Sequence, residues 1–171
     1  YFPKEIIKSK FLVKSKLNYA ENLLSKNDNS KAVTFISEHG YREEKTWKEL
    51  NNNSLRLVSF FKENKIKEKD RIAAYTANQI ETVESFIATS ALGAIWSSCS
   101  PDFGTQGVIE RFSQIRPKLL IITDRYYYNG KEINILERLP AILKKIKSIK
   151  SVLIFSYQGK KNLKQKKIKG I

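Results

Sequence analysis

Short hydrophobic runs alternate with amphipathic stretches along the second half of the chain. The runs occupy residues 72–75, 94–97, 119–122 and 152–155. Between them, hydrophobic residues recur at the spacing of a helix buried on one side: Ile80, Val83, Ile87 and Ala91, then Val108, Ile109, Phe112 and Ile115, then the apolar positions of 135–146. Pro117 should end the second helix, and Pro140 should break or restart the third. This alternation is typical of βαβ units, so we expect an α/β fold with a parallel sheet and helices on both faces.

The first 70 residues predict smaller elements that precede this sheet. Residues 17–24 have the apolar spacing of a short helix, and residues 33–45 predict a β-hairpin with its turn at 38–40. Thr46 and Glu49 fit a capping box, in which the threonine hydroxyl accepts from the third amide and the glutamate reaches back. The helix that begins there carries one apolar face, formed by Trp47, Leu50, Leu57, Val58 and Phe61.

The chain is strongly basic, but the charge is spread along the sequence. Lysine and arginine total 32 against 17 acidic residues, which gives a net charge of +15. Specific nucleic-acid contacts rely on the bidentate fork of arginine, and only seven of these cations are arginine. Residues 142–171 hold ten lysines and no acidic residue. We expect 158–171 to be a solvated Lys-rich tail or linker, and no nucleic-acid partner, with a polyanion-binding protein as an alternative.

Composition also narrows the class of protein. A length of 171 residues suggests one domain or slightly more. A single cysteine and a single histidine leave no internal disulfide framework and no His/Cys metal cluster. Lysines interrupt the N-terminal segment, and no run approaches the roughly 18 apolar residues of a membrane helix, so we expect a cytoplasmic protein without a membrane partner. Because methionine is absent, we also expect a fragment or a processed chain.

Familiar catalytic motifs are missing from the sequence. The seven glycines are scattered, so none forms a phosphate-cradling loop with a lysine and no GxGxxG follows a strand. The only histidine, His39, lies in the predicted hairpin turn, where we expect a structural role. We expect Cys99 to be a small buried hydrophobic residue, since no base neighbours it in sequence.

Two segments are candidate ligand-binding sites. Asp102 and Asp124 each lie just after a predicted strand, and open α/β sheets bind ligands beyond the carboxyl ends of their strands. Residues 97–104 either form a turn in which Asp102 or Thr105 caps the next helix, or present helix-start amides, freed by Gly104, to an anionic ligand. Residues 124–131 combine three tyrosines, a glycine and two cations. Such a loop either stacks a base and pairs with a phosphate, or simply packs on the surface.

Several runs of residues carry a family resemblance. They are Phe2-Pro3, 17–24, 46–50, 70–75 with Asn78, 88–104, 111–115 with Pro117, and 128–131. The most specific are Trp96-Ser97-Ser98-Cys99-Ser100-Pro101-Asp102-Phe103-Gly104 and Tyr128-Asn129-Gly130-Lys131. Together they resemble the N-terminal part of the acetoacetate–CoA ligases, a branch of the adenylate-forming acyl-CoA synthetase superfamily. Acetyl- and propionyl-CoA synthetases are the nearest relatives of that branch and differ in these two runs.

The resemblance implies an activity that uses acetoacetate, ATP with Mg²⁺, and CoA. It divides the chain into an N-terminal extension over 1–30, an incomplete α/β part of the large N-terminal domain over 31–157, and the tail over 158–171. The family's phosphate loop, adenine motif, ribose-binding aspartate, hinge and catalytic lysine would all follow residue 171. We therefore expect no catalytic residue in this chain, and no activity or strong cofactor binding by the chain alone.

The resemblance also suggests which residues touch CoA. In acetyl-CoA synthetases the loop matching 124–131 contacts the phosphorylated ADP end of CoA through two arginines. Those positions hold Tyr128 and Lys131 here, on either side of Gly130, and the turn with Asp102 and Phe103 matches a stretch near the same nucleotide. The alternatives are a stand-alone, non-catalytic α/β module that binds a nucleotide or anion, and a related acetyl- or propionyl-CoA synthetase.

Overall fold

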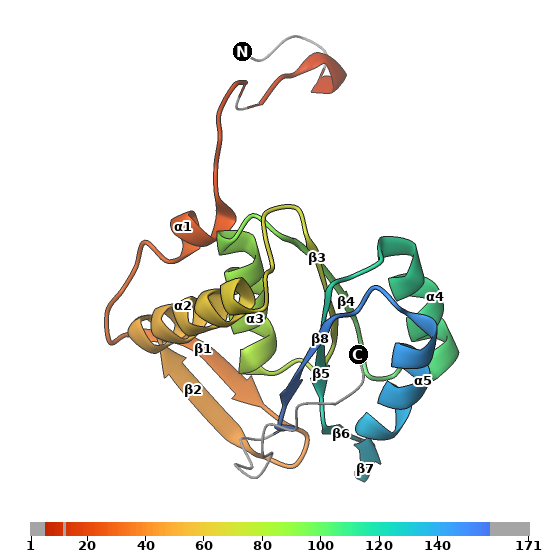
Figure 1. Ribbon diagram of the computed structural model, residues 1–171. Coiled ribbons are helices and arrows are strands. Elements are labelled where there is room, and N and C mark those ends of the chain that lie inside the picture. Colours follow the sequence, from red (N-terminus) through yellow and green to blue (C-terminus); the bar gives the residue numbers. More distant parts are fainter. Residues whose placement is uncertain (1–5, 12, 158–171) are drawn as a thin grey trace.

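A four-stranded parallel sheet forms the centre of the molecule (Figure 1). The structure, a computed structural model, describes residues 6–11 and 13–157. The strands are β3 (Arg71–Tyr75), β4 (Ile95–Cys99), β5 (Leu119–Thr123) and β8 (Ser151–Phe155), in the spatial order β4-β3-β5-β8. All five residues of β5 are buried, as expected for an inner strand covered on both faces. The predicted α/β fold with its parallel sheet is confirmed.

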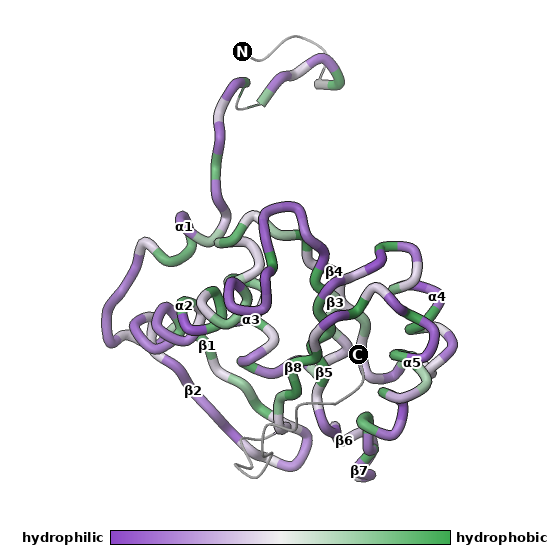
Figure 2. The backbone as a smooth tube through the Cα atoms, in the orientation of Figure 1, coloured by the Kyte–Doolittle hydropathy of each residue, from purple (hydrophilic) through white to green (hydrophobic). Residues whose placement is uncertain are grey.

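Helices cover both faces of this sheet, as the alternating pattern predicts. On one face lie α2 (Trp47–Glu63) and α3 (Ile80–Ala91), and on the other lie α4 (Thr105–Ile115) and α5 (Leu139–Lys145) (Figure 1). Phe61 packs with Ile72 and Ile121 beneath the first pair, whereas Phe112 belongs to the core beneath the second. Figure 2 shows the hydrophobic positions gathered along the central strands. Alternate residues of each strand therefore serve two separate cores.

Two N-terminal elements pack on the α2–α3 side: helix α1 (Tyr19–Leu23), and the antiparallel hairpin of β1 (Lys31–Ile36) and β2 (Arg42–Thr46). The 3₁₀ turn Ile6–Lys8 instead stands away from the sheet and its helices (Figure 1). Asn18 caps α1 by accepting from two amides, and its Nδ2 donates to the Ser90 carbonyl of α3 at 3.1 Å. The predicted capping box is present at the start of α2: the Thr46 side chain accepts from the Glu49 amide, and Glu49 accepts from the Thr46 amide.

The segment after β5 differs from the predicted loop. It forms an antiparallel hairpin of β6 (Arg125–Tyr128) and β7 (Lys131–Asn134). The two turn residues, Asn129 and Gly130, have φ angles of 49° and 73°, the left-handed backbone that a tight hairpin turn requires. The prediction of an irregular loop over 124–131 was therefore wrong, because the segment forms two paired strands. An Asn-Gly pair between strand-forming residues is the local signal for such a turn.

The other helix boundaries follow their proline signals. Helix α4 ends at Ile115, and Arg116 takes a left-handed conformation before Pro117. The predicted helix over 135–146 begins as the 3₁₀ turn Leu136–Arg138 and becomes regular only at α5, which has Pro140 in its first turn.

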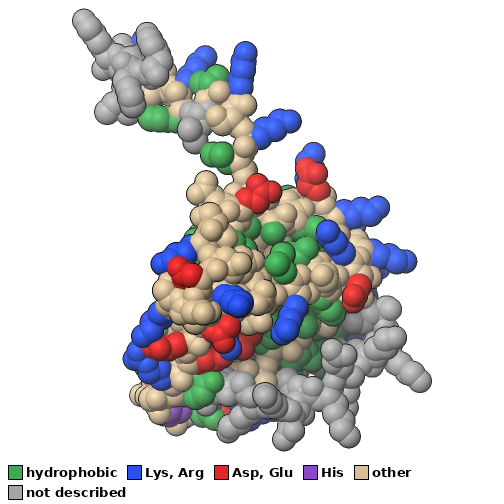
Figure 3. Space-filling view, turned by 90° about the vertical axis from the view of Figure 1, so that its left-hand side faces the viewer, with side chains coloured by type: hydrophobic (Ala, Val, Ile, Leu, Met, Phe, Trp, Pro, Cys, Tyr) green, Lys and Arg blue, Asp and Glu red, His purple; other side chains and the backbone are tan. Residues whose placement is uncertain are grey.

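The surface shows the mixed charge that the composition implies. Figure 3 shows basic, acidic and hydrophobic side chains interspersed on the side of the molecule that carries α1, α2 and the β1–β2 hairpin. The Lys-rich segment 158–171 and the Phe2-Pro3 match lie outside the described residues. Among the helices that the structure describes, none has the length and hydrophobicity needed to cross a membrane.

Candidate functional site

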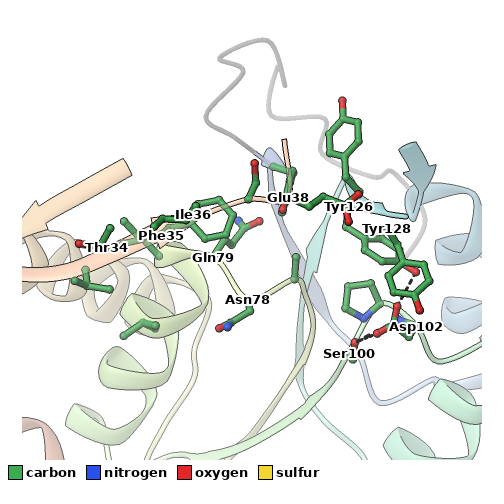
Figure 4. Close-up of a pocket in the computed structure, with 18 residues that line it drawn as sticks. Thr34, Phe35, Ile36, Glu38, Asn78, Gln79, Ser100, Asp102, Tyr126 and Tyr128 are labelled. Atoms are coloured by element: carbon green, nitrogen blue, oxygen red, sulfur yellow. Dashed lines mark hydrogen bonds between the residues drawn. The ribbon is translucent and has the colours of Figure 1, made fainter. Parts of the chain in front are cut away.

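A cavity of about 530 Å³ opens at the carboxyl-terminal edge of the sheet (Figure 4). Neighbouring strands β3 and β5 send their chains to opposite faces: β3 leads into α3, whereas β5 leads through the β6–β7 hairpin to α5. Such a reversal leaves a crevice beyond the strand ends, where open α/β sheets bind ligands. The cavity lies in this crevice. It is lined by the loop after β3, the turn after β4, the first residues of the β6–β7 hairpin, and β1 from the opposite side.

The turn after β4 is held by a cluster of hydrogen bonds from Tyr75 and Arg138. The Tyr75 hydroxyl lies 3.1 Å from the carbonyl oxygen of Pro101 and 2.6 Å from that of Phe103. Arg138 Nη1 donates to the same two carbonyls at 2.9 Å and also contacts the Tyr75 hydroxyl. Burial raises the pKa of Tyr75, although Arg138 opposes that rise. The protonated phenol and the guanidinium together satisfy carbonyls that the turn cannot pair internally.

Asp102 projects from this turn toward the β6–β7 hairpin. Its Oδ1 accepts from the Tyr126 hydroxyl at 2.9 Å, and its Oδ2 accepts from the Ser100 hydroxyl at 2.7 Å (Figure 4). Burial, reinforced by the Asp102 hydrogen bond and charge, raises the pKa of Tyr126 to about 12. Its hydroxyl therefore remains a donor across the physiological range.

Of the two alternatives for residues 97–104, the turn in which Asp102 or Thr105 caps α4 is wrong. Gly104 occupies the N-cap position, and no side chain caps the helix there. Neither Asp102 nor Thr105 performs that role, because Asp102 is engaged by Tyr126 and Ser100 and Thr105 is already the first helical residue. Asp102 is a residue type that commonly caps helices, but its carboxylate instead accepts from Tyr126, which lies 24 positions along the chain.

Glu38 joins the two hairpins at the mouth of the cavity. From the turn of the β1–β2 hairpin, its carboxylate accepts from the amides of Asn129 and Gly130, both at 3.1 Å. Successive amides in left-handed conformation form a concave anion site, and Glu38 fills it with a carboxylate. His39 packs edge-on against Tyr127, with ring centroids 4.5 Å apart, so its turn position agrees with the expected structural role.

The structure brings together some of the predicted site residues but not all. Asp102 and Tyr128 line the cavity. Gly130 lies in the hairpin turn with its amide bound to Glu38, and Lys131 is exposed on β7 next to it. Phe103 packs its ring against Arg111 on α4, with the guanidinium carbon 4.4 Å from the ring centroid. Gly130, Lys131 and Phe103 are not among the lining residues.

Other lining residues were not expected from the sequence. Phe35 of β1 meets Tyr157 edge-on, with ring centroids 5.7 Å apart, and Tyr157 follows the end of β8. Gln79, buried after β3, accepts from the Thr123 hydroxyl at 3.3 Å. The position of Tyr157 just after a strand end was a usable signal. No local signal could have placed β1 opposite these strands.

The titratable groups of the site suit binding better than nucleophilic chemistry. Cys99 is 6% exposed and belongs to the α4–α5 core, which confirms the expected buried hydrophobic role. Burial raises the pKa of its thiol, although Arg111 opposes the rise, so the reactive thiolate is disfavoured. Within residues 6–11 and 13–157, no three His, Cys, Asp or Glu side chains are grouped so as to hold a metal ion. The exposed aromatic ring of Tyr128 and the polar side chains that line the cavity remain as the means of recognition.

Comparisons with known proteins agree with this geometry. The profile of the AMP-binding enzyme family matches residues 21–170. The chain is 41% identical over 145 residues to acetoacetyl-CoA synthetase of Gallus gallus, covering 84% of this chain and 22% of that protein. It is 42% identical over 141 residues to acetoacetyl-coenzyme A synthetase of Rhizobium meliloti (strain 1021), covering 82% of this chain and 22% of that protein.

A solved structure matches as well. Acetoacetyl-CoA synthetase from Streptomyces lividans superimposes with a TM-score of 0.79 at 30% identity, over 84% of this chain and 23% of that one. The chain thus spans about a fifth of the length of the curated relatives it matches.

Proposed function

This chain belongs to the AMP-binding enzyme family, and from that premise we propose that the protein ligates acetoacetate to CoA. In the first step a carboxylate oxygen of acetoacetate attacks the α-phosphorus of ATP, and pyrophosphate leaves. In the second step the CoA thiol attacks the acyl carbon of the adenylate, and AMP leaves. The products are acetoacetyl-CoA, AMP and pyrophosphate.

The observation that carries this proposal is the identity to acetoacetyl-CoA synthetases of two distant organisms, 41% and 42% over most of the chain. The specific run 96–104 supports it, because it builds strand β4 and the turn that ends at the cavity. A substitution in this run would therefore alter the walls of the cavity as well as the sheet.

We further propose that this chain contributes contacts to the nucleotide end of CoA. Tyr128 is 62% exposed beside the cavity and offers a ring on which a base can stack. Lys131 is exposed on β7, so its ammonium can reach a phosphate from solvent. Asp102 and Phe103 hold the facing turn through their bonds to Tyr126 and Tyr75. Gly130 forms the turn between Tyr128 and Lys131, and its amide donates a hydrogen bond to Glu38.

ATP enters this proposal with Mg²⁺ on its phosphates, as a substrate complex. Adenylation needs preorganised cations around those phosphates. The glycines of the chain form no loop that would supply them. We therefore propose that residues 1–171 alone do not catalyse adenylation.

The test is acetoacetate-dependent exchange of labelled pyrophosphate into ATP, measured on the protein at the full length its gene encodes. We expect exchange with acetoacetate that exceeds exchange with acetate or propionate, followed by CoA-dependent release of AMP. Exchange that prefers acetate would assign a short-chain acyl-CoA synthetase instead. Absence of exchange with any of the three acids would leave a binding module. Robust exchange by residues 1–171 alone would contradict the division of labour proposed here.

A further inference from the structure

A second cavity, of about 580 Å³, lies at the amino-terminal edge of the sheet, opposite the first. It is formed by the starts of β3, β5 and β8 and by the ends of α4 and α5. We call it the basic pocket, and its lining residues are Arg71, Ser113, Arg116, Lys118, Lys145, Ile146, Lys147, Ser148 and Lys150.

The basic pocket gathers positive charge that the fold does not neutralise. Six of its nine lining residues are lysine or arginine, and none is acidic. Among the residues that the structure describes, one of these cations has an ion-pair partner: Lys118 Nζ donates to Asp70 at 2.6 Å. Burial alone would raise the pKa of Asp70, but hydrogen bonds from Lys118 and from the Lys67 amide keep it below its usual value. The ends of α4 and α5 add about half a negative charge each, which leaves a net of roughly four positive charges.

Two buried donors in the basic pocket lack protein partners. The Nε of Arg71 and the Oγ of Ser148 are inaccessible to solvent and form no hydrogen bond with any described residue. Buried polar atoms are nearly always paired, so these two donors keep hydrogen-bonding capacity that the described residues leave unused beside the cations of the pocket. Arg116 also lines the pocket, and its backbone has a φ of 49°, a conformation that glycine adopts more readily than arginine.

The chemistry of the lining narrows the anion. None of the described residues that line the basic pocket is aromatic, so they offer a nucleobase no surface on which to stack. The arginine forks and lysine ammonium groups instead match phosphate oxygens. We propose that the basic pocket is a binding site for a diphosphate group, recognised through its charge and oxygens rather than through any attached nucleoside. Free pyrophosphate and the diphosphate of a nucleotide share this chemistry.

Lysine footprinting tests this site without interference from the first cavity. The protein at the full length its gene encodes is acetylated briefly at low ionic strength, and each lysine is quantified by mass spectrometry. We expect inorganic pyrophosphate to slow acetylation of Lys145, Lys147 and Lys150 at least fivefold. Lys48 and Lys62, exposed on α2, should label at unchanged rates and serve as internal controls. ADP should protect at a similar concentration, and inorganic monophosphate only at much higher concentration.

Matched variants connect the protection to the pocket. Arg116→Gly removes one guanidinium and suits the left-handed backbone, so it should fold. It should raise the pyrophosphate concentration for half-protection by roughly five- to tenfold, whereas Lys48→Glu should not. Unchanged half-protection in Arg116→Gly would overturn the proposal. Equal protection of the control lysines, or protection by ADP but not by pyrophosphate, would also overturn it. The proposal would likewise fail if only nucleic acid protected the pocket lysines, or if these lysines did not label even without ligand.

Discussion

Replacing Glu38 with glutamine should loosen the turn of the β6–β7 hairpin. In the structure both carboxylate oxygens of Glu38 are used: one accepts from the Asn129 amide and the other from the Gly130 amide, each at 3.1 Å. Glutamine has a single acceptor oxygen and no charge. The substitution therefore removes one of the two hydrogen bonds and weakens the other, while the size of the side chain barely changes.

The magnitude follows from the exposure of the contact. Hydrogen bonds to charged groups contribute about 1.5–3 kcal/mol when shielded, and neutral ones about 0.5–1.5 kcal/mol. The Glu38 side chain is 37% exposed, so solvent competes for these donors. We expect a net loss of about 1 kcal/mol, which corresponds to a roughly fivefold increase in the local opening of the turn.

Residue-resolved hydrogen exchange measures that opening directly. In Glu38→Gln the amides of Asn129 and Gly130 should exchange about fivefold faster than in the wild-type protein. Glu44→Gln is a matched control, because Glu44 lies in the same hairpin but pairs with Lys31 at 2.8 Å rather than with the turn. Unchanged exchange at Asn129 and Gly130 in Glu38→Gln, or the same acceleration in both variants, would refute the claim that Glu38 holds the turn.

Three further predictions concern binding, pH and helix stability. Lys131→Ala should raise KM for CoA by roughly 5- to 30-fold, while kcat and acetoacetate-dependent pyrophosphate exchange stay unchanged. The reason is that a contact to a remote phosphate stabilises the ground state and the transition state equally. A wild-type KM in this variant would make Lys131 a structural residue. Burial raises the pKa of Glu84 to about 7, despite the hydrogen bond from Asn53. The folded state therefore holds an extra proton between about pH 4.5 and 7 and loses stability as pH rises through that window. Glu84→Gln should raise Tm by about 2–4 °C at pH 8 and leave it unchanged at about pH 4, where the glutamate is protonated in both states. An equal shift at both pH values would exclude the titration. Thr46→Ala should cost about 1 kcal/mol in chemical denaturation, because it removes a half of the capping box at α2, and Thr46→Ser should restore most of it; no loss in the alanine variant would show that the cap is dispensable.

Local elements were predictable where one short-range cause dominates. The apolar run 72–75 became β3 because four consecutive buried positions suit an inner strand covered on both faces. The capping box at Thr46 depends on residues only three positions apart, so no distant contact was needed to identify it. The Asn129–Gly130 turn had an equally local signal, and the predicted loop there missed a hairpin that the dipeptide indicates.

The candidate site was less predictable because its contacts join distant parts of the chain. Asp102 had the local chemistry of a helix cap, yet it pairs with Tyr126, and only the folded sheet brings the two together. The contact between Glu38 and Gly130 spans 92 positions. The sequence alone does not pair these two residues, since a carboxylate and a turn amide each have many possible partners.

The four strands of the sheet and the helices between them follow from local signals, because hydrophobic period, caps and prolines act within a few residues. Tertiary packing places β3 and β5 side by side, so that the loops after them form one cavity. It alone placed six cations from separate segments around the basic pocket at the opposite edge. The physical reason is that strand order depends on how buried faces pack against one another across the whole chain, and no local backbone preference encodes that choice.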